Sequence, residues 1–342
     1  MKILITCDPE IPVPPKLYGG VERLVDGLVT AYTKLGHQVI LLAHKDSTSE
    51  KAVKIYSWKA KHSRGFRNVI QNAIVLFKTY NKEKPDVIHS FSRLLYTYPL
   101  LLTSKVKFLQ TYGRAISSKS TALASIIGGK KMNFTSAATH MLNNLKWFKY
   151  KFTPVYNFTD TNFFAPDENI EKEYLMFLGR IEDIKGTKEC IEVALATNNK
   201  LIIAGNIQPG HEQYFKTYIE PHLNNPLIKY VGPVDDEQKR YWLQRSKALL
   251  FPIKWEEPFG IVMIEAMACG TPVIGFKKGS VPEIIINQKN GFVVNNTKEM
   301  IDACQKINMI DRNFVRQYCV DNFDTIAIAK QYINLLENLA KR

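Results

Sequence analysis

Two carboxylates, Glu257 and Glu265, stand at the two ends of one apolar segment of the chain. Pro258 suits the first turn of a helix and Gly270 suits the left-handed residue that ends one. The pattern therefore predicts a helix that begins just after Glu257 and carries Glu265 two turns along. An ionised carboxylate among apolar neighbours needs hydrogen-bond donors. We expect Glu265 to meet either a donor of the protein or the hydroxyls of a ligand, such as a sugar or a ribose.

The start of the same helix is a predicted anion site. The first amides of a helix have no carbonyl partner within it, and the helix dipole adds positive potential there. These amides fall around Phe259, Gly260 and Ile261, and Gly260 has no side chain that would keep a ligand from the backbone. The sequence therefore predicts that a phosphate group docks at this point.

A loop with two cations follows a predicted strand at residues 174–178. It reads Gly-Arg-Ile-Glu-Asp-Ile-Lys-Gly, and Gly179 permits a sharp exit from the strand. A guanidinium binds phosphate oxygens as a fork, and an ammonium binds them as a point charge. Arg180 and Lys185 are therefore predicted to converge on a diphosphate.

A pair of glycines, Gly19 and Gly20, lies between a predicted strand at 2–6 and a predicted helix at 21–35. Paired glycines let the backbone come close to a ligand, and the helix that follows offers its first amides to an anion. A plain turn without ligand contact is the alternative interpretation of this loop.

These segments resemble the retaining glycosyltransferases of family 4, which have the GT-B fold of two facing Rossmann-like domains. The resemblance rests on the spacing Glu-x7-Glu and on several neighbouring motifs. They are Glu-Ala-Met-Ala-x-Gly-Thr-Pro-Val-Ile at 265–274, Gly-Ser-Val-Pro-Glu at 279–283, Gly-Phe-Val-Val at 291–294, Gly-Arg-x4-Lys-Gly at 179–186 and Gly-Gly-x-Glu-Arg at 19–23. The similarity covers nearly the whole chain and is strongest between residues 174 and 294.

The resemblance implies a nucleotide-sugar donor and a role for each candidate residue. Glu257 would contact sugar hydroxyls near the reacting carbon, and Glu265 would hold the ribose. Arg180 and Lys185 would stabilise the departing phosphate. The implied catalytic set is thus Glu257, Arg180 and Lys185. The implied donor-binding set is Gly19, Gly20, Gly179, Arg180, Lys185, Gly205, Pro233, Val234, Phe259, Gly260, Ile261 and Glu265, in which the strand-end turns at Gly205 and at Pro233 and Val234 hold the base.

The chain departs from the family pattern at one position. Many relatives have His-Gly where this sequence has Tyr112 and Gly113, followed by Arg114. The usual histidine contact with the donor sugar is therefore left open. His89, near a predicted strand end, is interpreted as a core histidine in preference to a substitute for it.

The order of elements predicts an α/β fold. Short apolar strands alternate with helical patterns in two successive series, which indicates two mostly parallel, doubly wound sheets. We expect a GT-B arrangement of an N-terminal Rossmann-like acceptor-binding domain at 1–165 and a C-terminal nucleotide-sugar-binding domain at 166–323. An amphipathic helix at 324–342 is expected to return to the first domain.

Composition excludes several classes of protein. A chain of 342 residues with 45% hydrophobic content is long enough for two cores. No apolar run is long enough to span a membrane, and the apolar N-terminal stretch is too short for a signal peptide. Five scattered cysteines without a C-x-x-C spacing argue against zinc and against a disulfide framework. We therefore expect a cytoplasmic protein with reduced cysteines.

The net charge of +14 is concentrated in the first half of the chain. Residues 1–165 hold 24 Lys and Arg against 9 Asp and Glu, and residues 87–159 contain no acidic residue. A local positive surface attracts anionic lipid headgroups or acidic glycans. The stretch 87–159 is thus predicted to rest on an anionic membrane surface, on the inner face of the cytoplasmic membrane, with a merely solvated basic face as the alternative. No nucleic-acid partner is expected.

The predicted function is that of a retaining glycosyltransferase acting on a glycan, a lipid-linked acceptor or a small molecule, in cell-surface polysaccharide or glycolipid biosynthesis. The nearest acidic cluster, Asp235 to Glu237, has the pattern of a helix N-terminus. No metal ion and no cofactor are therefore expected, and the nucleotide sugar is a co-substrate. Two alternatives remain open, a nucleotide-sugar epimerase of the same architecture and a non-catalytic module that binds nucleotide sugar or lipid.

Overall fold

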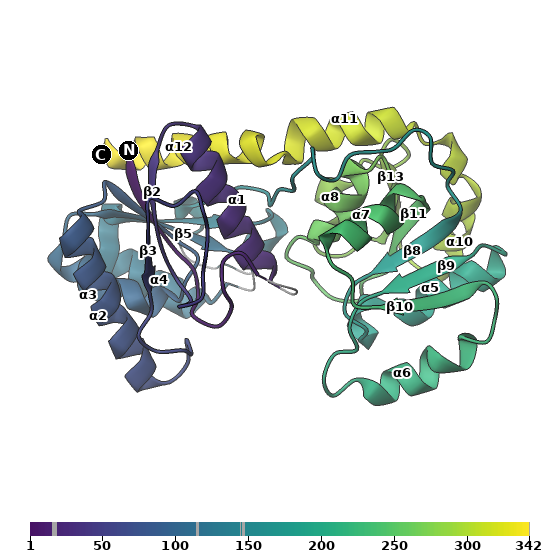
Figure 1. Ribbon diagram of the computed structural model, residues 1–342, viewed down its shortest axis with the longest axis horizontal. Coiled ribbons are helices and arrows are strands. Elements are labelled where there is room, and N and C mark those ends of the chain that lie inside the picture. The colour runs from purple at the N-terminus through teal and green to yellow at the C-terminus, as the bar shows by residue number, and fades with distance from the viewer. Residues whose placement is uncertain (16–18, 114–115, 144, 146–147, 342) are drawn as a thin grey trace. The chain divides into compact units, whose positions relative to one another are not determined.

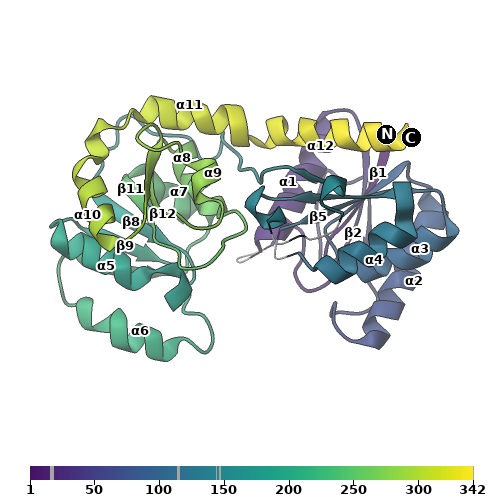
Figure 2. The same ribbon diagram turned by 180° about the vertical axis from the view of Figure 1, so that it is seen from behind.

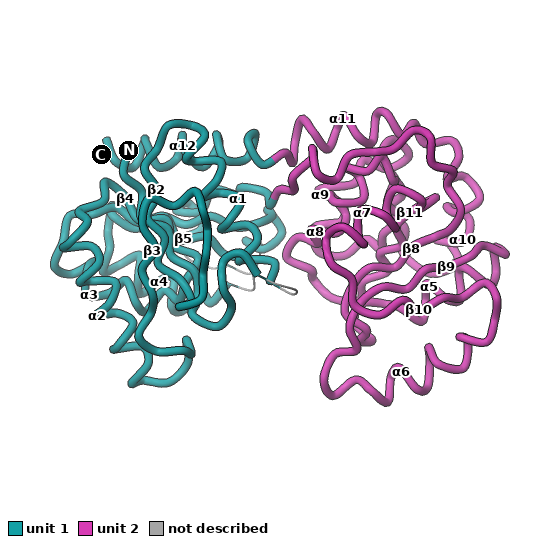
Figure 3. The backbone as a smooth tube through the Cα atoms, in the orientation of Figure 1, with its two compact units in different colours: residues 1–157, 325–342 teal, residues 158–324 magenta. Residues whose placement is uncertain are grey.

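The computed structural model describes residues 1–15, 19–113, 116–143, 145 and 148–341. The described chain forms two compact α/β units (Figure 3). Unit 1 consists of residues 1–157 and 325–342, and unit 2 of residues 158–324. The predicted fold class, with two parallel doubly wound sheets, is confirmed.

The sheet of unit 1 has seven described strands in the order β3-β2-β1-β4-β5-β6-β7, and neighbouring strands run parallel. The chain starts at β1, adds β2 and β3 on one side, and then crosses over to add the other strands. The strands are β1 (Lys2–Thr6), β2 (Gln38–Ala43), β3 (Lys54–Ser57), β4 (Val87–Ser90), β5 (Lys107–Tyr112), β6 (Met132–Ser136) and β7 (Phe152–Pro154).

Helices cover both faces of this sheet (Figures 1 and 2). The helices of unit 1 are α1 (Gly20–Lys34), α2 (Phe66–Glu83), α3 (Tyr98–Thr103), α4 (Ser118–Gly128) and α12 (Thr325–Ala340), with 3-10 turns η1 (Leu94–Thr97), η2 (Gly129–Lys131), η3 (His140–Leu142) and η4 (Lys149–Lys151). The C-terminal α12 packs against α1, β4 and β5, so the predicted return of the last helix to the first unit is confirmed.

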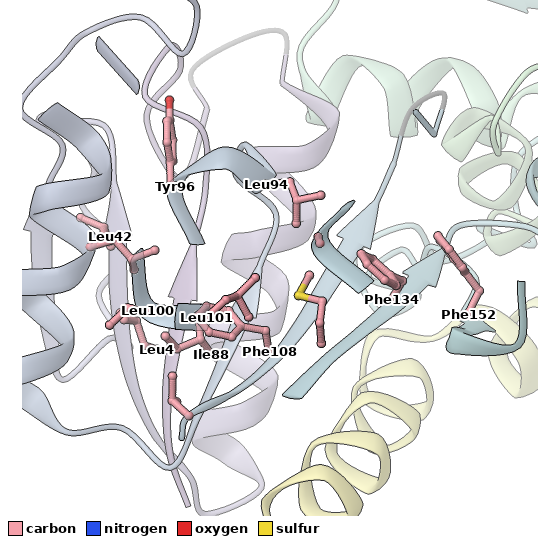
Figure 4. Packing of buried hydrophobic residues seen from close by; sticks show 14 of the residues in the cluster. Leu4, Leu42, Ile88, Leu94, Tyr96, Leu100, Leu101, Phe108, Phe134 and Phe152 are labelled. Carbon is pink, nitrogen blue, oxygen red and sulfur yellow. The ribbon is translucent and has the colours of Figure 1, made fainter. Parts of the chain in front are cut away.

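The core of unit 1 explains why its strands are nearly continuous apolar runs. Leu4, Ile88, Phe108 and Phe134 of four neighbouring strands pack in one cluster (Figure 4), to which α2, α3 and α4 contribute Leu76, Leu101 and Ala124. Leu100 of α3 is fully buried against them. A parallel sheet with helices on both faces buries every side chain of its central strands, which favours β-branched and aromatic residues there.

Unit 2 repeats this architecture with six described strands in the order β10-β9-β8-β11-β12-β13, again parallel. The strands are β8 (Tyr174–Leu178), β9 (Leu201–Ala204), β10 (Ile228–Gly232), β11 (Ser246–Phe251), β12 (Val273–Phe276) and β13 (Gly291–Val294). The helices are α5 (Thr187–Ala196), α6 (Glu212–Tyr218), α7 (Asp236–Gln244), α8 (Ile261–Ala268), α9 (Val281–Ile284), α10 (Thr297–Gln305) and α11 (Arg312–Phe323), with 3-10 turns η5 (Asp183–Lys185), η6 (Glu220–His222) and η7 (Ile307–Met309).

The junction between the units lies before Phe158, eight residues earlier than the predicted boundary after residue 165. Phe158 and Phe164 are buried in unit 2. The amide of Thr159 donates to Phe323 O at 3.0 Å, and Arg316 Nη1 donates to Phe164 O at 3.2 Å. The segment 158–165 has a polar sequence overall, but its aromatic side chains anchor it to the second core.

The cysteines and the helices can be compared with the predictions of reduced cysteines and of no membrane span. All five cysteines are buried and free. No helix among the described residues has both the length and the apolar character that a membrane span requires.

Candidate functional site

The sheet of unit 2 has a switch point between β8 and β11. From β8 the chain adds β9 and β10 on one side and then crosses to add β11, β12 and β13 on the other. The loops that leave the carboxyl ends of β8 and β11 therefore diverge, and ligands of doubly wound sheets bind in the crevice that this divergence leaves. The β8 loop carries Arg180 and Lys185, and the β11 loop leads to Glu257.

The two loops are held together by close backbone contact. The amide of Lys254 donates to Ile184 O at 2.9 Å, and Lys254 Nζ lies 2.7 Å from Asp183 and 2.8 Å from Glu189. Gly186 has φ +78°, and a Cβ there would lie 2.2 Å from Pro252 O. Only glycine fits this approach, so the last residue of the Gly-Arg-x4-Lys-Gly motif is required by packing.

Glu257 and Lys185 form an ion pair at this edge. Lys185 Nζ donates to Glu257 Oε2, and Trp255 Nε1 donates to the same oxygen at 2.9 Å. Each of the two charged side chains is 14% exposed, and the ammonium also lies 5.2 Å from the centre of the Trp255 ring. The ammonium has two further protons, so Lys185 can hold Glu257 and still donate to a ligand.

Arg180 has a different carboxylate partner. Its Nη2 lies 2.8 Å from Glu182 Oε1, and the guanidinium is 30% exposed. His211 Nε2 approaches the other oxygen of Glu182 at 3.9 Å. The structure thus places both predicted cations in the β8 loop, each held by its own carboxylate.

Glu265 lies inside α8 and is almost fully buried, with a side chain that is 3% exposed. Lys239 Nζ of α7 donates to Glu265 Oε1 at 2.5 Å and lies 2.8 Å from Asp236. Burial lowers the pKa of Lys239, but attraction from Glu265 and Asp236 outweighs this and raises it above the ordinary value. The protein donor that the sequence required for Glu265 is therefore Lys239.

The second carboxylate oxygen of Glu265 has no hydrogen-bond partner in the described part of the chain. A buried acceptor without a donor costs about 1–3 kcal/mol, and more when it is charged. Such an atom is uncommon in a folded core and calls for an explanation. A donor supplied by a ligand would remove this cost.

The helix that carries Glu265 begins later than predicted. Gly260 has φ +79° and stands just before α8, so Pro258 belongs to the preceding loop and Glu265 lies little more than one turn from the start. A Cβ on Gly260 would lie 2.8 Å from the Phe251 ring. Phe259 is buried and offers only its backbone, whereas Ile261 is half-buried at the first helical position.

Three glycines, Gly179, Gly205 and Gly232, lie next to one another at the carboxyl ends of β8, β9 and β10. Gly205, with φ +146°, has its Cα so close to Gly179 that a Cβ would lie 1.8 Å from the carbonyl oxygen of Gly179. The amide of Gly205 donates to Gly232 O at 2.8 Å. Pro233 and Val234 follow directly and are exposed and half-buried. These predicted base-binding positions therefore share one edge of the sheet with Arg180 and Lys185.

Sequence reasoning assigned no role to three residues that position this edge, namely Lys239, Trp255 and Gly279, although Gly279 belongs to the motif at 279–283. Lys239 comes from α7, far from Glu265 in the sequence, and no local pattern indicates the pair. Gly279 has φ +53°, and a Cβ there would lie 2.4 Å from Glu257 O, while the amide of Ser280 donates to that oxygen at 3.2 Å. The Gly-Ser pair at 279–280 was a visible signal for this contact.

The remaining candidates belong to unit 1. Gly19 precedes α1, and a Cβ there would lie 2.6 Å from Pro15 Cβ, whereas Gly20 is the first residue of the helix. Tyr112 is half-buried at the end of β5 and packs against Phe134 and Phe152. Arg114 lies outside the described residues.

His89 is a core residue, as its sequence context indicated. Its Nδ1 bonds to Tyr32 Oη at 3.0 Å, and its Nε2 bonds to Thr111 Oγ1 at 2.8 Å. Its ring packs against Tyr332 of α12 with 4.8 Å between centroids. Burial lowers the pKa of His89 to about 3, so the ring is neutral and takes no part in acid–base chemistry near neutral pH.

Two family models match the chain. Residues 158–314 match the model described as Glycosyl transferases group 1, and residues 18–117 match the model described as Glycosyltransferase Family 4. A probable sucrose-phosphate synthase from Thermosipho melanesiensis is 36% identical over 197 residues, which are 52% of this chain and 45% of that protein. The match also spans only about a third of the length of several other curated relatives.

Solved structures resemble the whole chain. Sucrose-phosphate synthase from Thermosynechococcus elongatus superposes with a TM-score of 0.81 at 18% identity, over 99% of this chain and 98% of that chain. The Anabaena protein HepE, solved in complex with UDP and glucose, has a TM-score of 0.78 at 15% identity, over 99% and 100%. At these identities the likeness shows the fold, which is GT-B. The two models and this fold agree with the predicted family, and the chain belongs to the group 1 glycosyltransferases of the family 4 type.

Proposed function

We propose that this protein transfers a sugar from a nucleotide-sugar donor to a glycan, lipid-linked or small-molecule acceptor, with retention of configuration and without a metal ion. The observation that carries the proposal is the buried Oε2 of Glu265, which has no hydrogen-bond partner among the described residues and lies on the helix that follows β11. A ribose hydroxyl donates to a carboxylate oxygen, so a bound nucleotide would satisfy this atom. The match to the group 1 glycosyltransferase model covers the same unit.

The charges at this edge suit a diphosphate leaving group. When the bond between sugar and phosphate breaks, negative charge develops on the phosphate oxygens. Arg180 and Lys185 are already in place in the β8 loop, and preorganised cations near developing charge supply a large share of catalysis in many enzymes. In the proposed reaction they do the work that a metal ion does in other transferases.

Glu257 is proposed to act on the sugar. It lies at the end of the β11 loop, fixed by Lys185 and by Trp255, and its carbonyl is held by Ser280. A carboxylate fixed at one oxygen can accept a sugar hydroxyl with the other and so orient the reacting carbon. Glu257 is therefore the residue on which sugar transfer, as distinct from nucleotide binding, should depend.

The test is a donor screen on the purified chain. Thermal unfolding is followed with UDP, GDP and ADP and with their common sugar conjugates, because a ligand that binds only the folded state raises its stability. At least one nucleotide should raise the unfolding temperature of the wild type and fail to raise that of Glu265→Ala. If none stabilises the wild type, the proposed donor class is wrong.

The same donor separates the rival reactions. An epimerase would convert a labelled nucleotide sugar without any acceptor, and a binding module would leave it unchanged with every acceptor. A transferase should release nucleotide in proportion to glycosylated product. Epimerised donor in the absence of acceptor would replace the proposed reaction by the rival one.

We also propose that unit 1 rests on an anionic membrane surface through part of the stretch 87–159. In the corner formed by α3, α4, η2 and η4, four large apolar side chains and four lysines are exposed. They are Leu102, Leu123, Ile126 and Tyr150 and Lys105, Lys119, Lys130 and Lys149. Apolar side chains interspersed with cations suit an interface with acidic lipid headgroups.

Several other basic and apolar residues of the stretch 87–159 serve the fold instead. Lys151 Nζ donates to Gly129 O at 2.6 Å, and Lys131 Nζ donates to Ser104 O at 3.0 Å. Phe152 is buried in the core and Ile127 is partly buried against it. Lys146 and Trp147 lie outside the described residues.

Vesicle sedimentation tests the membrane proposal with Lys119, Lys130 and Lys149 changed together to Glu. Each cation near an anionic bilayer contributes on the order of 1 kcal/mol, so the triple variant should stop sedimenting with phosphatidylserine vesicles at low salt. Lys216, Lys298 and Lys306 of unit 2 are exposed and provide the matched triple control. Wild-type binding that is equal for neutral and anionic vesicles would contradict the proposal.

A further inference from the structure

Unit 1 contains a polar cavity at the switch point of its own sheet. The strand order places β1 beside β4, and the chain diverges between them to opposite sides. The cavity has a volume of about 360 Å³ and is lined in part by residues that follow β1 and β4 and by the last residues of β5. Val21 in the first turn of α1 forms part of its wall. Such a crevice is where a doubly wound sheet binds a ligand.

One of the residues that line the cavity, Gln110, carries a buried acceptor for which the described residues supply no donor. Gln110 is 2% exposed, and its Oε1 has no hydrogen-bond partner among the described residues. Its Nε2 donates to Ser92 O at 3.0 Å, which fixes the amide, since the reversed amide would set two acceptors against each other. A group that donates, such as a hydroxyl, is required to satisfy the remaining oxygen.

The wall of the cavity holds an arginine that pairs with no carboxylate among the described side chains. Arg93 Nη1 donates to Ser63 O at 2.8 Å, and the other donors of the guanidinium remain for a ligand. Arg64 is exposed on the same wall. Asp8 also lines the cavity, and its Oδ1 accepts the amide of Arg93 at 2.9 Å, so the two arginines outnumber the one carboxylate.

We propose that this cavity binds an acidic sugar, whose hydroxyl donates to Gln110 and whose carboxylate or phosphate pairs with the Arg93 guanidinium. Hydroxyl donors satisfy an amide oxygen, and a guanidinium fork matches both kinds of anion. The inference rests on the proposed function, in which this sugar is the acceptor. It assigns to unit 1 the recognition of acceptor charge.

Ligand-detected NMR and calorimetry with three soluble probes test the inference. Glucuronate carries a carboxylate, glucose 6-phosphate carries a phosphate, and glucose is neutral. At least one acidic sugar should bind roughly tenfold to a hundredfold more tightly than glucose, the range for a hydrogen bond to a charged group, and high salt should reduce the difference. The two acidic probes show which anion the cavity prefers.

Variants of residues that line the cavity test whether the sugars bind there. Arg93→Gln should bring the acidic sugars to the affinity of glucose, and Gln110→Met should weaken all three sugars. Arg67→Gln is the matched control, because Arg67 is exposed nearby on α2 and does not line the cavity. An unfolding temperature equal to that of the wild type shows that the fold of a variant is intact. Arg93→Lys keeps the charge and should therefore retain part of the preference for acidic over neutral sugars.

Two results would overturn the inference. The first is equal affinity for acidic and neutral sugars, or no binding of either. The second is a preference for acidic sugars that remains in the Arg93→Gln variant. Failure of the proposed function gives a different pattern, in which acidic sugars still bind to unit 1 but no nucleotide sugar stabilises the protein.

Discussion

Lys239 is the most informative residue to change in unit 2. It joins Glu265 to Asp236 and is itself 13% exposed, so its ammonium compensates a carboxylate that has almost no water. Lys239→Met keeps most of the length of the side chain and removes only the charge. The variant isolates what the ion pair contributes.

The size of the expected loss in unfolding free energy follows from the burial of Glu265 and Lys239. Removing one partner of a buried ion pair costs about 3–5 kcal/mol, because the other charge stays in a poorly solvated site. Asp236 has a side chain that is 34% exposed, so water can compensate part of its loss, whereas the Glu265 side chain is 3% exposed. The cost therefore arises mainly at Glu265, and we expect a loss of about 3 kcal/mol in the free energy of unfolding, the lower end of that range.

Urea unfolding followed by tryptophan fluorescence measures this loss, since Trp242 and Trp255 both lie in unit 2. A double-mutant cycle with Glu265→Gln supplies the control. Once the carboxylate is neutral, loss of the ammonium should cost less, about 1.5 kcal/mol, the lower end of the range for a hydrogen bond with one charged partner. Equal costs of Lys239→Met in both backgrounds, or an unchanged urea midpoint, would refute the ion-pair argument.

Further predictions concern the donor site and the core of unit 1. Glu257→Gln should abolish sugar transfer and leave the nucleotide dissociation constant within about twofold, and wild-type turnover of this variant would show that the assignment is wrong. Arg180→Ala and Lys185→Ala should each weaken binding of nucleoside diphosphate by about 1.5–3 kcal/mol and binding of free nucleoside less, and equal losses for both ligands would indicate misfolding. Because burial lowers the pKa of His89 to about 3, only the unfolded chain takes up its proton as the pH falls below about 6.5. Stability should therefore decline from that pH toward about 3, and His89→Gln should flatten this part of the curve of unfolding free energy against pH. Turnover should survive EDTA, and a strict need for Mn²⁺ or Mg²⁺ would remove the metal-free mechanism.

The central strands were predictable, because a strand that is buried on both faces of the sheet has a continuous run of apolar residues in the sequence. Lys2–Thr6 and Tyr174–Leu178 were predicted with both ends as observed. The edge strand β3, Lys54–Ser57, was missed, because it is largely exposed and has no apolar run. Strand β6 was missed for another reason, since Thr135 and Ser136 are buried polar residues that hydrogen bonds satisfy.

The candidate site was predictable where a motif is local in sequence. The β8 loop could be located, because a strand end followed by glycine leaves a recognisable pattern, whereas the start of α8 was predicted too early, at Pro258 in place of Ile261. The partner of Glu265 could not, since Lys239 reaches it from another helix. The pairing of Lys185 with Glu257 also depends on which strands are neighbours, and strand order at a switch point is a property of the whole sheet.

The two units share a feature that the fold alone does not require. Among the described residues, each has a buried acceptor without a donor, Glu265 Oε2 on the helix that follows β11 in unit 2 and Gln110 Oε1 near the end of β5 in unit 1. An apolar residue of similar size at Gln110 would avoid the cost of an unpaired acceptor, whereas at Glu265 it would also remove the carboxylate partner of Lys239. Acceptors that weaken the free protein are expected where a ligand supplies the donor. Double replacement by Glu265→Met and Gln110→Met should therefore weaken binding of both ligands, and wild-type affinity for either ligand would break the link between unpaired acceptors and binding.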